Sequence, residues 1–158
     1  MSTLSRNRKV SESAFELIYL ETVSHFKEKG QNEKITDLGY TVGHKFIERF
    51  TRGKTRLSST LDALKFLCKD VWQTLFGKTV DKLQTNHKGV FVLHDNNFKW
   101  ISRIMNSTSS SSETIVEEMK AYLLFPAGLI KGALKNLGIE STVRADYAEG
   151  LSTFNIQI

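Results

Sequence analysis

The stretch from Leu61 to Phe76 constrains the fold of this chain most, because it predicts a helix that is apolar around most of its circumference. Apolar residues recur in it at spacings of three and four, which places them on one face, and aromatic residues widen that face. The remaining polar positions form a narrow stripe: Asp62, Lys65, Lys69 and Gln73. Such a helix has to be covered on most sides by other parts of the chain.

Residues at both ends of this helix mark where it begins and stops. Ser59 can accept a hydrogen bond from an amide of the first turn, and Gly77 can adopt the left-handed conformation that ends a helix. After the helix, Val90 to His94 predicts a strand, Asp95 to Asn97 a tight turn, and Phe98 to Arg103 the returning strand. The central stretch therefore predicts a buried helix followed by a hairpin.

Two amphipathic helices precede this stretch. Ser13 and Glu16 form a capping-box pattern that starts the first helix, Gly30 closes it, and the second helix runs from about residue 35 to 51. The apolar stripe of the first helix consists of Phe15, Ile18, Val23 and Phe26, and that of the second of Ile35, Leu38, Val42, Phe46 and Phe50.

Gly39 and Gly43 lie one turn apart on the same face of the second helix, and Gly128 and Gly132 repeat this spacing. Glycine inside a helix costs about 1 kcal/mol relative to alanine, which a close approach by another backbone can offset. That backbone could belong to this chain or to a second subunit. Because the first two helices carry more apolar positions than one sheet face needs, we predict that they pack on a second subunit. The predicted interface is Phe15, Ile18, Leu38, Gly39, Val42, Gly43 and Phe46.

The C-terminal third predicts a loop, a helix and a hairpin. Residues 106–113 form a Ser/Thr-rich exposed loop, and a helix over 114–137 contains Pro126, where we expect a kink or a restart. Apolar and polar residues alternate on both sides of Glu149–Gly150, which predicts a final hairpin with its turn at these two residues. Because the predicted strands form hairpins and no strand–helix–strand units, we predict one α+β domain over residues 12–158. The polar and basic residues 1–11 before it are predicted to form a mobile arm.

The composition restricts the kind of partner. The net charge is +5 and the isoelectric point about 9.3, which favours nucleic acid, anionic lipid or an acidic protein surface. The basic residues between Lys45 and Arg56 are explained better by a solvated helix end than by a functional patch. Because the sequence has no RNA-recognition signature, only its charge supports an interpretation as a nucleic-acid-binding module. This interpretation stays an alternative to that of a protein-interaction subunit.

The sequence contains no catalytic constellation that we can assemble. The four His show no metal-ligand spacing, and no glycine-rich phosphate loop occurs, so we predict no metal, cofactor or enzymatic activity. His94 and Asp95 are adjacent on a strand and should point to opposite faces. Cys68 lacks a base at helical spacing and should be a buried packing residue. The single cysteine and the lack of long apolar runs lead us to expect a soluble intracellular protein.

Several blocks of the sequence resemble the small-subunit family of the transport protein particle (TRAPP), and within it the subunit 6 group. The blocks are "LGYTVGHKFIERF", "LDALKFLCKDVW", "LQTNHKGVFVLHDNNF" and "GLIKGALKNLGIES", and the resemblance covers about residues 38–158. It implies an α+β fold with helices packed on one side of a twisted antiparallel sheet. Some relatives carry an acylated Cys in the link before the third helix, whereas residues 53–58 here contain none.

The resemblance also implies a function. Small subunits of this family assemble side by side, and subunit 6 pairs with a sister subunit of the same fold as a non-catalytic scaffold. The whole complex is an exchange factor for a Rab GTPase and tethers vesicles between the endoplasmic reticulum and Golgi. The implied location is the cytoplasm, peripheral at the cis-Golgi and endoplasmic reticulum, with Rab contacted indirectly and nucleic acid not at all. The resemblance does not decide whether the basic segment from Lys45 to Arg56 contacts the Golgi membrane.

Overall fold

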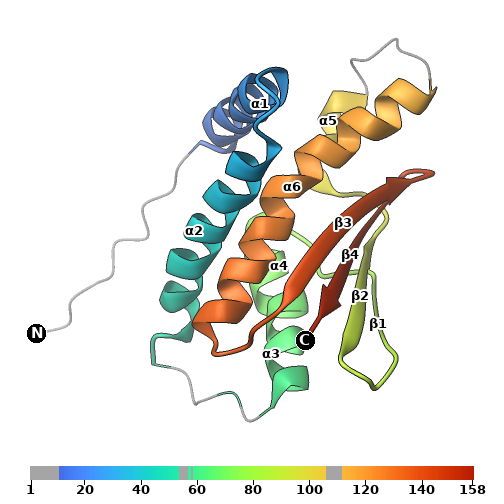
Figure 1. Ribbon diagram of the computed structural model, residues 1–158. Helices are drawn as coiled ribbons and strands as arrows, with labels where there is room; N and C mark the ends of the chain where they lie inside the picture. The colour runs from blue at the N-terminus through green and yellow to red at the C-terminus, as the bar shows by residue number, and fades with distance from the viewer. Residues whose placement is uncertain (1–10, 54–56, 58, 106–111) are drawn as a thin grey trace, which may run out of the picture.

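The computed structural model describes residues 11–53, 57, 59–105 and 112–158 (Figure 1). The predicted basic arm falls almost entirely outside these residues, as does most of the predicted Ser/Thr-rich loop. The helices are α1 Glu12–Glu28, α2 Asn32–Thr51, α3 Thr60–Phe66, a π-helical turn Leu67–Val71, α4 Trp72–Phe76, α5 Lys99–Met105 and α6 Ser112–Asn136. The strands are β1 Lys82–Thr85, β2 Val90–Asp95, β3 Thr142–Ala148 and β4 Leu151–Gln157.

The strands form one antiparallel sheet in the order β1-β2-β4-β3, and the helices pack on one side of it (Figure 1). The β2–β4 pairing brings the two hairpins together and aligns Phe91 with Ile156 and Leu93 with Phe154, all four buried. The predicted α+β class is therefore confirmed, as is the final hairpin. Its turn has positive φ at both Glu149 and Gly150, at 51° and 83°, the conformation of a type I′ turn.

One predicted strand is wrong. Residues from Phe98 to Arg103 do not return along β2, because α5 begins at Lys99 and the two edges of β2 are paired with β1 and β4. Phe98, Trp100 and Ile101 are all buried, which a strand facing the core on one side cannot achieve for adjacent positions. The Asp95 carboxylate accepts a hydrogen bond from Asn97 N at 3.1 Å and helps to end the strand.

The central apolar helix forms with the predicted ends. Ser59 Oγ accepts a hydrogen bond from Asp62 N at 3.1 Å, and Gly77 has φ of 74°. The sequence did not predict the π-helical turn in its middle, where Trp72 N donates to Leu67 O. Cys68 O accepts instead from Val80 N at 3.1 Å, which ties the helix to the segment leading into β1.

The start of α1 and the course of α6 differ from the expectation. The helix α1 begins at Glu12 after Ser11, so Ser13 lies inside it and the capping box is wrong. The helix α6 continues through Pro126 without restarting. Proline provides no amide for Tyr122 O four residues earlier, and Tyr19 Oη donates to that carbonyl instead. Burial, and secondarily Tyr122, raise the pKa of Tyr19, which keeps its hydroxyl protonated.

The two glycine pairs pack against each other where α2 crosses α6. A Cβ added at any of the four positions would lie 2.0–2.1 Å from a carbonyl oxygen of the opposite helix. The pairs of glycine and oxygen are Gly39 with Phe125, Gly43 with Leu129, Gly128 with Thr36 and Gly132 with Tyr40. The approaching backbone therefore belongs to this chain, and a bulky residue at Gly43 would disrupt the fold itself.

We predict that Gly43→Ala lowers the free energy of unfolding by about 3 kcal/mol. The added methyl group meets the backbone of Leu129, which cannot move like a flexible side chain, and this cost exceeds the gain in helix propensity of about 1 kcal/mol. Chemical denaturation measures the change. The control is Lys45→Ala on the exposed side of the same helix, and equal stability of the two variants would contradict the proposed contact.

Candidate subunit interface

An apolar groove opens between α1, α2, α4, α5 and α6, with a volume of about 250 Å³. Each of these elements contributes at least one side chain, so the groove exists only in the folded chain. Its lining residues are Glu12, Phe15, Val42, Phe46, Thr74, Leu75, Trp100, Phe125 and Leu129. We call this surface the apolar groove.

The groove brings together part of the predicted interface. Phe15, Val42 and Phe46 line it, and Leu38 lies one turn before Val42 on the same face of α2. Phe15, Leu38 and Val42 are 38%, 40% and 38% exposed, which is high for large apolar side chains. The periodicity of the first two helices found these positions, because an apolar residue beside the buried stripe still counts toward the pattern.

Ile18 lies elsewhere on α1. It is 68% exposed and lines a shallow apolar depression with Leu17 and Phe26 on the outer side of the helix. The buried residues of α1 are Glu16, Tyr19 and Val23. Of the predicted stripe, Val23 is buried and Phe26 partly buried, whereas Phe15 and Ile18 lie toward solvent.

Gly39 and Gly43 do not belong to an accessible surface. Both are buried, and the space beside each is filled by the α6 backbone. Their inclusion in the interface is corrected: the spacing detected a close helix contact, but that contact is internal.

Aromatic residues form the walls of the groove, including Trp100, which the sequence analysis had placed on a strand. The ring centroid of Trp100 lies 5.0 Å from Phe15, 5.2 Å from Tyr19 and 5.9 Å from Phe125. Contacts of this kind restrain the rings, so the groove has a defined shape before any partner binds. Trp100 could not have been found by periodicity because α5 is short.

Charged groups lie at the edges of the groove. The carboxylate of Glu12, which lines it, forms an ion pair with Lys99 Nζ and links the start of α1 to α5. The lining of the groove thus combines apolar side chains with one charged residue, Glu12.

The residues weighed for chemistry are dispersed. His94 Nε2 lies 2.7 Å from Gln84 Oε1 on the neighbouring strand, while Asp95 is buried, so the two form no dyad. Within the described residues no three His, Cys, Asp or Glu side chains are placed to hold a metal ion. Over the same residues, no helix is long and apolar enough to cross a membrane. Cys68 is buried in the π-helical turn, where desolvation raises its thiol pKa to about 12.

Comparison with known proteins places this chain in a class. Residues 15–158 match the family described as Transport protein particle (TRAPP) component. The chain therefore belongs to the TRAPP component family. A solved structure with the same fold is trafficking protein particle complex subunit 3 from Naegleria fowleri covalently bound to palmitic acid, with a TM-score of 0.74, 14% identity and coverage of 91% of this chain and 92% of that one.

Within the family, the chain is similar to trafficking protein particle complex subunit 6. It is 40% identical over 144 residues to subunit 6B of Homo sapiens, covering 85% of this chain and 88% of that protein. Subunit 6A of Homo sapiens is 42% identical over 111 residues, covering 70% of this chain and 67% of the relative. The resemblance noted in the sequence is thereby confirmed.

We predict that Cys68 does not react with iodoacetamide at pH 8 in the native protein and reacts fully after denaturation. Burial keeps the thiol protonated, and the thiolate is the reactive species. Intact-mass spectrometry after a timed pulse measures the modified fraction. The denatured sample is the control for reagent activity, and rapid native modification would contradict the packing role.

Proposed function

We propose that this protein is a non-catalytic scaffold subunit of the TRAPP complex, and that it pairs with a sister small subunit through the α1–α2 face. Family membership supports a component of the complex. The observation that carries the pairing is the apolar groove, since a single chain leaves Phe15, Val42 and Leu38 substantially exposed. Covering such residues by a second chain removes apolar surface from water.

The groove has features of an interface core. Its aromatic walls give a fixed shape into which a partner side chain could insert, and buried anchors of this type carry most of the binding energy in many interfaces. Leu17 and Ile18 extend apolar surface around the outer side of α1 and could widen the contact area. A sister subunit of the same fold is the proposed occupant of the groove.

In this proposal the assembled complex acts as a Rab guanine-nucleotide exchange factor and as a vesicle tether in endoplasmic reticulum to Golgi transport. The subunit contributes assembly surfaces, and the GTPase is contacted by the complex and not by this chain alone. Its location is cytoplasmic and peripheral at the cis-Golgi and endoplasmic reticulum. A peripheral contact with the Golgi membrane would use basic residues of the segment from Lys45 to Arg56.

We predict that Val42→Glu weakens binding of the sister subunit at least tenfold, because a carboxylate would be desolvated at the centre of the contact. Tenfold corresponds to about 1.4 kcal/mol. Affinity capture of the full-length protein from cytosol, with quantitative identification of co-purifying TRAPP subunits, measures the loss. Val42 is 38% exposed, so the isolated fold should tolerate the change.

The matched control is Leu61→Glu. Leu61 is 41% exposed and lies at the start of α3, outside the groove, so the same change there should leave capture unaffected. Unchanged capture by Val42→Glu would place the interface elsewhere. Recovery of ribosomal or chromatin proteins in place of TRAPP subunits would favour the nucleic-acid alternative.

We also predict that the purified subunit alone does not accelerate nucleotide release from a Rab GTPase, because the proposed role is assembly. Release of a fluorescent guanine nucleotide is the measurement, and the intact TRAPP complex is the positive control. Acceleration by the single subunit at comparable concentrations would refute the scaffold role.

A further inference from the structure

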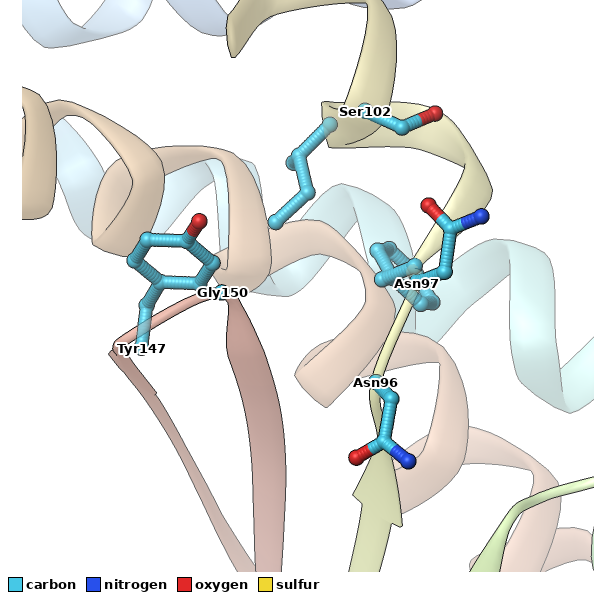
Figure 2. Close-up of a pocket in the computed structure, with 7 residues that line it drawn as sticks. Asn96, Asn97, Ser102, Tyr147 and Gly150 are labelled. Atoms are coloured by element: carbon cyan, nitrogen blue, oxygen red, sulfur yellow. The ribbon is translucent and has the colours of Figure 1, made fainter.

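A second pocket lies at the corner of the sheet where β2 ends, and none of its lining residues belongs to the apolar groove. Asp95 and Ser152 are the last residue pair between β2 and β4. Beyond them Asn96 and Asn97 turn away toward α5, while the β3–β4 turn lies opposite (Figure 2). The cavity has a volume of about 480 Å³, within the range of ligand sites, and its described lining is Asn96, Asn97, Phe98, Ile101, Ser102, Tyr147 and Gly150.

Asn96 and Asn97 form one wall of this pocket, and a network of charged side chains fixes their backbone. The fully buried Asp95 carboxylate accepts hydrogen bonds from Trp72 Nε1 at 2.8 Å and from Lys78 Nζ at 2.7 Å. Lys78 Nζ also contacts Asp81 at 2.7 Å, and Asp81 accepts from Asn96 N at 2.8 Å. Because these carboxylates raise the pKa of Lys78, the bridge between them stays charged.

This support leaves the two asparagine side chains available. The backbone amides of Asn96 and Asn97 are bound by Asp81 and Asp95, and within the described chain neither carboxamide forms a hydrogen bond. Both side chains are exposed at the pocket, opposite the ring of Tyr147 (Figure 2). The corner therefore has hydrogen-bonding capacity that the fold leaves unused.

The chemistry of the lining selects a class of ligand. Among the described lining residues there is no Lys, Arg, Asp or Glu, so a charged group buried here would lack a counter-charge. A carboxamide offers both a donor and an acceptor, the same pair that a peptide unit presents. Phe98, Ile101 and Tyr147 also line the pocket, as buried side chains that form its apolar wall.

We propose that this corner pocket binds a short, uncharged, extended peptide segment of another chain of the complex, with Asn96 and Asn97 hydrogen-bonding to its backbone. The inference rests on the proposed function, because a subunit within a multichain assembly meets polypeptide at more than one surface. The loop is fixed before binding, so little ordering cost opposes the contact.

The test places the photo-crosslinker p-benzoylphenylalanine at position 97 of the full-length protein in the assembled complex. The matched control carries it at the exposed Gln157, at the other end of β4. Irradiation should give a crosslink from position 97, absent from position 157, to one polypeptide of the complex. Mass spectrometry should map that crosslink to an uncharged segment.

A double variant, Asn96→Ala with Asn97→Ala, removes both carboxamides and keeps the backbone amides that Asp81 and Asp95 bind. It should reduce retention of the crosslinked polypeptide at least fivefold. Overturning results are no position-specific crosslink, a crosslink to lipid or nucleic acid, or full retention by the double variant. Co-purification of the sister subunit, measured in the same sample, tests the apolar groove separately, so failure at the corner pocket is distinguishable from failure of the proposed function.

Discussion

The direct backbone contact between α2 and α6 determines how the other helices can be arranged. Four glycines let the two helices approach until a carbonyl oxygen occupies the place of each missing Cβ. This proximity places α6 between the sheet and α2, and α1 is joined to the start of α2 by a short link. The position of Phe15 beside Val42, on which the apolar groove depends, is therefore a consequence of the glycine contact.

Local signals in the sequence predicted the elements well but not their partners. Ser59 and Gly77 identified both ends of the central helix, because capping depends only on neighbouring residues. Two errors had separate causes. The glycine spacing of Gly39 and Gly43 was consistent with an internal or external backbone, and the short α5 offered too few positions to separate a helix from a strand.

The candidate sites were predictable to different extents. Phe15, Val42 and Phe46 were found because they extend apolar stripes on long helices. The other walls of the groove come from distant parts of the chain, and only the tertiary fold brings them together. The corner pocket gave no signal, since consecutive asparagines after a strand are typical of an ordinary turn. Its distinguishing property is the buried Asp95, whose partners are also distant in sequence.

The π-helical turn in the central helix alters the angular phase of everything after it. One additional residue within a helix rotates the following positions by about 100° relative to an uninterrupted α-helix. Trp72 is the first residue after that turn and directs its indole nitrogen to Asp95. A chain shortened by one residue within Leu67–Val71 would still have an apolar helix of nearly the same length. Its indole would point away from the sheet, leaving a buried carboxylate with one donor fewer.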